Sequence, residues 1–250
     1  MKGTVQLDER PDTAQRTSDR KIRSGGLAQR LNALRAGVLG ANDGIVSTAA
    51  VVVGVAGATT DAGPILMAGL AAAVGGAVSM ALGEYVSVSS QRDSERHLIE
   101  QQSQALRNDP EGELLALARS YEERGISAAT ARRAAEELFA SNALEAQMRE
   151  RHNIDPDEVT SPWHAAIASF LAFAVGALLP LLAILLPSPE LRVPVAFGAT
   201  LLSLALTGAI AAGIGGGSQL RAAARVTLGG ALALAVTYAI GSLIGTTGLV

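Results

Sequence analysis

The chain has 250 residues, of which 49% are hydrophobic but only 3% aromatic, and it carries a net charge of −3. Its charged residues gather before residue 35 and between residues 91 and 160, and long stretches of small and aliphatic residues carry almost none. This segregation excludes a water-soluble domain and indicates an integral membrane protein in a lipid bilayer. The sequence has no cysteine, which excludes thiolate metal sites and leaves oxygen, imidazole or thioether ligands.

The chain begins with a polar, charged segment that has no apolar stretch of the kind found in a signal peptide. We predict that residues 1–30 form a disordered cytosolic tail. No sorting signal is visible, and we expect a prokaryotic plasma membrane.

Five apolar stretches are long enough to cross a hydrocarbon core, which takes about 20 residues at a rise of about 1.5 Å each. The expected fold class is therefore all-α: a polytopic membrane protein with five transmembrane helices and a cytosolic helical insert between the second and the third. The first two stretches contain one acidic residue each, Asp43 and Glu84, and the last three contain none. The predicted spans cover residues 36–58, 64–88, 164–187, 193–214 and 225–248.

Basic residues predict the orientation of these spans. Five of them lie between Arg20 and Arg35, before the first span, and Arg221 and Arg225 flank the last, whereas the turn after the first span has none. By the positive-inside rule the N-terminus and the insert are cytoplasmic. Arg192, in the turn between the third and fourth spans, departs from this pattern. The chain thus divides into the tail, spans 1–2 (31–90), the insert (91–162) and spans 3–5 (163–250).

The insert contains fifteen acidic residues and nine arginines, a net charge of −6. Asp109-Pro110 predicts a helix start, and a second helix is expected near Ser127 and a third near Ser141. No turn signal lies between Gly83 and Arg107, so the second span can continue into the cytosol without a break. The residues expected to be buried are Leu114, Leu117, Ala118 and Tyr121 in the first helix, Ala131, Ala134, Ala135 and Leu138 in the second, and Leu144 and Met148 in the third.

Asp43 lies about 10 Å from the cytoplasmic start of its span, and Met80 about 9 Å from the cytoplasmic exit of the next one. The two side chains can therefore share one layer of the membrane. A charge at such depth costs roughly 2.5 to 3.5 kcal/mol, which favours a functional role for Asp43. Met80, taken by itself, is more readily explained as apolar filler.

Glu84 follows Met80 by four residues and projects from the same helix face, on which Gly76 and Ala72 lie deeper and could leave a path open. A carboxylate with a thioether suits iron, manganese or cobalt better than magnesium or calcium. One copy of each ligand cannot fill a coordination sphere, which favours a homodimer. Gly75, Ser79 and Gly83 form a row of small residues for close helix packing, either between two copies or within one chain.

The insert offers further oxygen ligands and one thioether, although most of its acids are expected to be solvated. It has no Glu-x-x-His pair of the di-iron type and no phosphate-binding loop, so we expect neither an enzyme nor a nucleic-acid-binding protein, and no permanently bound cofactor. The candidate ligands of the insert are Glu95, Glu100, Glu111, Glu113, Met148 and Glu150.

Three segments of the sequence resemble the vacuolar iron transporter family: LRAGVLGANDGIVS (34–47), SMALGEYVSVSSQRD (79–93) and FLAFAVGALLPLL (170–182). The resemblance implies a homodimeric transporter that moves ferrous iron, and often manganese, out of the cytosol in exchange for protons. The metal would pass between the first two helices of both protomers. Asp43 and Met80 stand where the membrane ligands of the family stand, and Glu84 is a natural third contributor.

The insert departs from the metal-binding pattern that the resemblance implies. Glu113 keeps a matching acid, but Gln102, Ala105 and Ala116 stand where carboxylates are expected. Arg151 lies near another such position, and the thioether position falls on Gln147, beside Met148. Two alternatives follow: a shifted site made of Glu95, Glu100, Glu111 and Met148, or an insert that serves mainly for dimer packing.

Our leading hypothesis is a proton-coupled transporter in which a divalent ion and a proton compete for the Asp43 carboxylate. The alternatives are a membrane-anchored metal sensor or scaffold, which would not need Asp43, and a membrane enzyme, which would need paired carboxylates and histidines.

Overall fold

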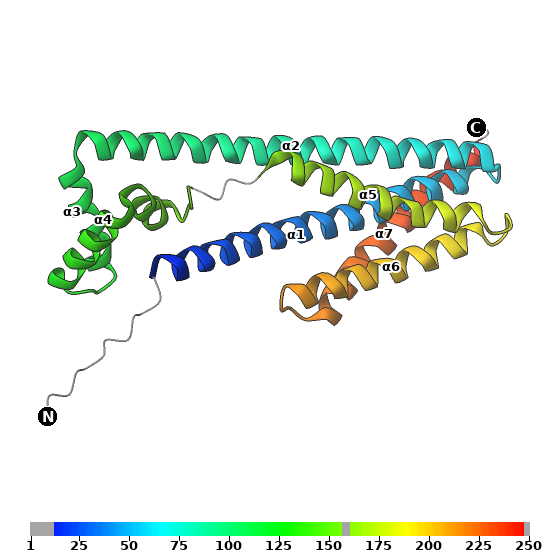
Figure 1. Cartoon of the computed structure of the whole chain (residues 1–250). Helices are drawn as coiled ribbons and strands as arrows, with labels where there is room; N and C mark the ends of the chain where they lie inside the picture. Colours follow the sequence, from blue (N-terminus) through cyan, green and yellow to red (C-terminus); the bar gives the residue numbers. More distant parts are fainter. Residues whose placement is uncertain (1–12, 157–160, 248–250) are drawn as a thin grey trace, which may run out of the picture. The chain divides into compact units, whose positions relative to one another are not determined.

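The computed structural model describes the backbone of residues 13–156 and 161–247, and the side chains of these ranges from Ala36 onward. The described backbone is helical throughout apart from turns and short connections, which confirms the all-α prediction. The helices are α1 (Thr13–Ala58), α2 (Ala62–Asn108), α3 (Pro110–Glu123), α4 (Ala128–His152), α5 (Pro162–Leu185), α6 (Arg192–Ile214) and α7 (Gln219–Thr246) (Figure 1).

Five helices are long and apolar enough to cross a membrane, as predicted, and the first candidate span, Ala36–Ala58, coincides with the expected one. The others lie in α2, α5, α6 and α7. Helix α2 runs without a break from Ala62 to Asn108, which confirms that the second span continues beyond its apolar part. The chain is therefore an integral membrane protein with five candidate spans.

The N-terminal segment differs in part from the prediction. Residues 1–12 of the expected tail lie outside the described residues, whereas the backbone is already helical from Thr13. Residues 13–24 contain no proline or glycine that would interrupt a helix.

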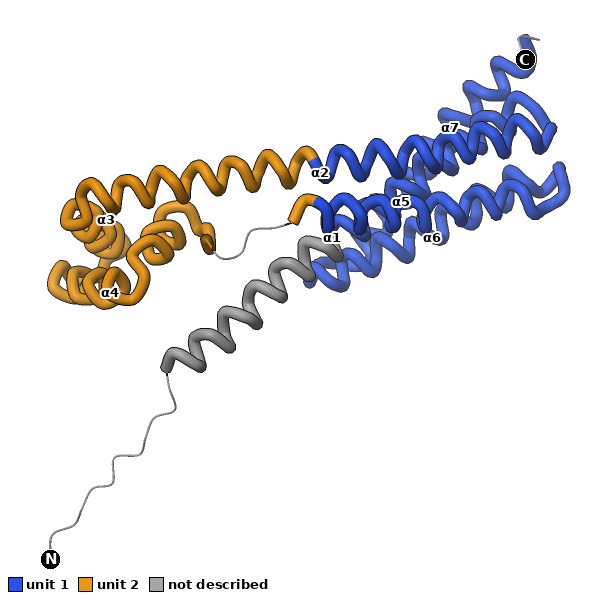
Figure 2. Tube along the Cα trace, turned by 45° about the horizontal axis from the view of Figure 1, so that its top comes forward, with its two compact units in different colours: residues 1–85, 163–250 blue, residues 86–162 orange. Residues whose placement is uncertain are grey.

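The chain forms two compact units (Figure 2). The membrane unit comprises residues 1–85 and 163–250, and the insert unit comprises residues 86–162. Helix α2 begins in the first and ends in the second.

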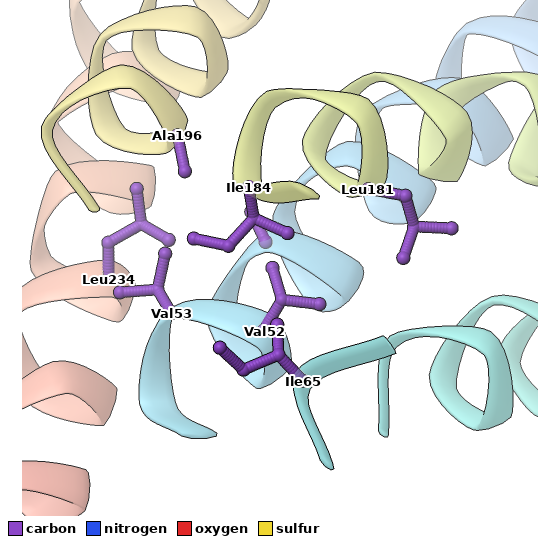
Figure 3. Packing of buried hydrophobic residues seen from close by; sticks show 8 residues of the cluster. Val52, Val53, Ile65, Leu181, Ile184, Ala196 and Leu234 are labelled. Carbon is purple, nitrogen blue, oxygen red and sulfur yellow. The ribbon is translucent and has the colours of Figure 1, made fainter. Parts of the chain in front are cut away.

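All five spans contribute to one buried apolar cluster in the membrane unit (Figure 3). Val52 and Val53 of α1 lie at its centre, because α1 packs against α5, α6 and α7. Ala49 of α1 also belongs to it, and each other span adds one or two members: Ile65, Leu181, Ile184, Ala196 and Leu234.

Glycines bring α1 close to its neighbours. A Cβ atom at Gly44 would collide with the carbonyl group of Phe173 in α5, and one at Gly241 of α7 would collide with the carbonyl of Gly54. Small residues at such crossings are the usual means of helix association in lipid, where there is no hydrophobic driving force. The α1 helix is thus fixed on several sides by backbone-to-backbone contact.

Arg192, which departs from the positive-inside pattern, has a structural role. Its guanidinium Nη1 donates a hydrogen bond of 2.7 Å to the main-chain carbonyl of Thr60. The turn before α6 is thereby tied to the turn between α1 and α2. A basic residue at this end of the bundle is explained by this bond and does not require a cytoplasmic location.

The insert unit starts as the sequence predicts. The Gly112 amide donates to the Asp109 Oδ1 at 2.8 Å, which caps α3 in front of Pro110. Gly125 has a φ of +89°, a left-handed conformation that suits glycine and ends the α3 segment. The core of the unit consists of Leu117, Ala118 and Ala135, with Leu114, Tyr121, Phe139 and Ala146 packed against it.

One prediction for α4 needs correction. Leu138 is 42% exposed, and the neighbouring Phe139 packs on the core in its place, because Phe139 follows the buried Ala131 and Ala135 at intervals of four residues on one helix face. The expected helix start near Ser141 is observed one residue later as a kink, where the Asn142 side chain accepts a hydrogen bond from the Glu145 amide. Asn142 therefore acts as an N-cap inside a nearly continuous helix.

We expect Gly241→Ala to destabilise the membrane unit by about 1 to 3 kcal/mol, because the new methyl group must push α7 away from α1. Gly229→Ala on the same helix is the matched control, since no atom lies within 4 Å of its Cβ position. That change should be neutral or stabilising, by up to about 1 kcal/mol from helix propensity. Thermal unfolding in detergent measures both, and equal midpoints for the two variants would contradict the packing described here.

Candidate metal site

Asp43 lies on an exposed stripe of α1. The neighbouring residues point elsewhere: Gly44 faces α5, and Asn42 accepts a 3.4 Å hydrogen bond from Thr207 of α6. Asp43 itself is exposed, as are Leu39 and Val51, which follow the same face at intervals of four and eight residues. In a single chain the carboxylate therefore lies at bilayer depth on an otherwise apolar surface.

The Asp43 carboxylate has no hydrogen-bond or ion-pair partner among the side chains that the structure describes. Only its main-chain carbonyl is engaged, by the Ser47 hydroxyl at 2.6 Å. Within the described ranges, no group of three or more His, Cys, Asp or Glu side chains could hold a metal ion. One chain alone does not complete a site around Asp43.

Met80 is half-buried and packs on a small cluster formed by Ala77, Phe173 and Ala177. The Phe173 ring also lies directly over Gly76. The prediction that Gly76 leaves a path open along this face is therefore wrong, because the space beside the glycine is filled by an aromatic ring from α5.

The helix register supports a shared layer for Asp43 and Met80. The Cβ position of Gly69 in α2 lies 2.7 Å from the Val52 Cγ1 in α1, which fixes the level of these two consecutive, antiparallel helices. Counting back from Val52 to Asp43 and forward from Gly69 to Val78 covers the same rise, about 13.5 Å. Met80 is one further step of about 3 Å along α2.

Glu84 lies one turn beyond Met80 and is half-buried. The next residue, Tyr85, stacks on Trp163 of α5 with ring centroids 4.9 Å apart and planes tilted by 55°. Tyr and Trp concentrate at the boundary between lipid and water. Glu84 therefore lies beside an aromatic pair of the kind found at the membrane boundary.

The small-residue row of α2 is not used for packing inside the chain. Gly75, Ser79 and Gly83 are all exposed, and no atom lies within 4 Å of a Cβ position at either glycine. Of the two roles that the sequence leaves open for this row, packing within one chain is excluded in the described structure. The row remains available to a second protein surface or to lipid.

The acids of the insert are engaged separately. Glu150 forms an ion pair with Arg124 at 2.6 Å, and Glu95 accepts a 2.8 Å hydrogen bond from Gln91. Glu100 and Glu111 are exposed, whereas Met148 is fully buried. The ion pair of Glu150 and Arg124 also acts on the Tyr121 hydroxyl: burial raises the pKa of this hydroxyl, the Glu150 charge raises it further, and Arg124 opposes the shift. The described chain does not bring the predicted shifted site together.

Glu113 keeps an acid at a position where the family resemblance implies a metal ligand, but its carboxylate is bound by other side chains. Its Oε2 receives the Gln102 amide at 2.7 Å and the Arg151 guanidinium at 3.0 Å. Arg151 and Gln147 were expected only as departures from the metal-binding pattern, and their contacts with Glu113 were not predicted. Their spacing of four residues, which places both on one face of α4, was the available signal.

Comparison with known proteins gives a consistent result over nearly the whole chain. Residues 34–242 match the model of the VIT family. A vacuolar iron transporter of Acanthamoeba castellanii is 43% identical over 211 residues, which is 84% of this chain and 78% of the relative. Vacuolar iron transporter homolog 2.1 of Arabidopsis thaliana is 33% identical and covers 88% and 85% of the two chains. Vacuolar iron transporter homolog 2 of Oryza sativa is 37% identical and covers 85% and 91%.

Proposed function

The chain belongs to the VIT family, and we propose on this basis that it moves divalent iron or manganese across a membrane, out of the cytosol and in exchange for protons. The observation that carries the proposal is the exposed Asp43 carboxylate, which lies at bilayer depth without a described partner. A charge that faces lipid is costly, so this surface has to be covered by protein or line a polar path.

A second copy of the chain supplies the cover in our proposal. The exposed stripe of α1 and the small-residue row of α2 belong to consecutive helices that pack together at Val52 and Gly69. An interface around a two-fold axis repeats every residue, so it would bring two Asp43 carboxylates toward each other. The Gly75, Ser79 and Gly83 row would let the two α2 helices approach closely.

Met80 and Glu84 complete the proposed path. Two Asp43 carboxylates and two Met80 thioethers, one of each from either protomer, form a mixed oxygen and sulfur ligand set of the kind that suits borderline divalent metals. Glu84, at the cytoplasmic surface, attracts the hydrated cation before it enters. Phe173 of α5 packs against the Met80 side chain and restricts its position.

Proton exchange follows from the chemistry of the carboxylate. Metal ligation needs the deprotonated form, so a proton and a metal ion exclude each other at Asp43. A proton that binds as the metal leaves also neutralises a charge that would be costly in a low-dielectric site. Alternating occupancy then couples the two fluxes.

The membrane remains a prediction. We expect a prokaryotic plasma membrane with the insert in the cytoplasm, whereas the relatives described above are eukaryotic proteins that are named for the vacuole. Plasma and vacuolar membranes both bound the cytosol, so the proposed direction of transport is the same in either. A membrane anchor for a metal sensor or scaffold is the competing hypothesis, and it gives no role to Asp43.

We expect Asp43→Asn to lower Mn²⁺ and Fe²⁺ uptake into proteoliposomes by about tenfold or more, the effect of losing about 1.4 kcal/mol or more of binding. The remaining uptake should no longer depend on a pH gradient. Asp61→Asn, the same chemical change in the exposed turn after α1, is the control and should leave both properties intact. Metal uptake by Asp43→Asn at the original rate against an opposing pH gradient would disprove the mechanism.

We expect Met80→Leu to weaken the apparent affinity for Fe²⁺ and Co²⁺ by about tenfold, or about 1.4 kcal/mol, and that for Mn²⁺ by less. The substitution keeps the side-chain volume against Phe173 and removes only the sulfur. Met67→Leu, at an exposed position on the same helix, should have no effect. Competition between metals in the flux assay gives the comparison, and an unchanged preference would remove Met80 from the ligand set.

The homodimer can be tested by cross-linking because the chain has no native cysteine. We expect Ser79→Cys to yield a covalent dimer in membranes with a short bis-maleimide. Leu171→Cys is the control: it is also exposed and lies at a similar level, on α5, but on a face of bulky residues. Equal cross-linking at both positions would indicate random collision and would contradict the proposed interface.

A further inference from the structure

Four polar side chains from three helices form a closed network in the insert unit. Gln102 of α2 donates to the Glu113 Oε2 and accepts a 3.2 Å hydrogen bond from the Arg151 Nη1. Arg151 of α4 pairs with the same Glu113 oxygen through its other terminal nitrogen. Gln147, one turn before Arg151, donates to the main-chain carbonyl of Glu113 at 2.6 Å. We call these four residues the insert clasp.

The clasp is largely buried, with Arg151 at its edge. Gln147 is fully buried, Gln102 is 5% exposed and the Glu113 side chain is 16% exposed, whereas the Arg151 side chain is 36% exposed. A partly buried carboxylate needs a cation or several hydrogen-bond donors beside it, and here it has both. Its charge is already balanced by the guanidinium, without any other ion.

We propose that the Arg151 guanidinium is the permanent counter-ion of the Glu113 carboxylate. The clasp then holds α2, α3 and α4 together without metal, and Glu113 is not a metal ligand. A divalent ion at Glu113 would have to displace the guanidinium and would be repelled by it at close range. The Gln102 oxygen, which could otherwise coordinate, already accepts from Arg151. The amide oxygen of Gln147 is buried without a partner among the described residues, but one neutral oxygen does not make a cation site.

A clasp whose counter-ion is covalently part of the chain keeps the same structure at low and high metal concentration. In this proposal the insert therefore does not sense metal through Glu113. The acidic surface of the insert still attracts cations by its net charge.

Mn²⁺ binding by the full-length chain in lipid nanodiscs tests the proposal, with free Mn²⁺ measured by electron paramagnetic resonance. We expect Glu113→Gln to bind as much Mn²⁺ as the wild type, because no ligand is lost. Arg151→Glu removes the cation and places a second carboxylate beside Glu113 and the Gln102 oxygen, so it should gain bound Mn²⁺. Arg132→Glu is the control: it makes the same charge change on α4, at an exposed pair with Glu136, and should gain none.

A lower amount of bound Mn²⁺ in Glu113→Gln than in the wild type would overturn the proposal. This comparison does not depend on whether Arg151→Glu folds, since it uses only the wild type and a nearly isosteric variant. Binding by the membrane unit is common to all four proteins and cancels in the differences. The result is therefore independent of the proposed transport path.

Discussion

A carboxylate at bilayer depth is costly when it is exposed to lipid. This constraint applies to Asp43, and the interpretation of the exposed faces of α1 and α2 depends on it. In the single chain the side chain lies on the outer stripe of α1, and no described group neutralises it. The spans expose many apolar side chains, as lipid-facing helices do, and among them Asp43 is a described carboxylate without a described partner. We propose that a second copy of α1 and α2 covers this surface.

Glycine packing determines which face of α1 is left exposed. Gly44 and Gly54 bring the backbones of α5 and α7 into direct contact with α1, and Asn42 contacts α6. With these sides occupied, Asp43 has only the remaining side available. Replacing these glycines by larger residues would move α1 outward and change where the carboxylate lies, so helix packing and the candidate site are one problem.

Local patterns in the sequence predicted much of the fold, and contacts distant in sequence accounted for what was missed. The five spans, the Asp109 cap and the helix start near Ser127 depend on nearby residues and were predicted correctly. The Phe173 ring over Gly76 joins residues of two helices far apart in the chain, and no periodicity reveals such a pair. Leu138 was wrong because the buried face of α4 follows Ala131, Ala135 and Phe139 at intervals of four residues, which leaves Leu138 beside it.

Glu113 in the insert unit and Asp43 in the membrane unit differ in how their charges are balanced. This difference favours a structural role for Glu113 and a transport role for Asp43. Glu113 has a guanidinium and an amide within hydrogen-bond distance, so its charge is balanced whether or not metal is present. Among the described side chains Asp43 has neither, and in our proposal its charge is balanced by something that arrives: a metal ion, a proton or the groups of another protomer. A carboxylate of the first kind stabilises a fold, whereas one of the second kind favours exchange, because every occupant of the site is replaceable. On physical grounds, then, the transported ion is expected at Asp43 rather than in the acid-rich insert.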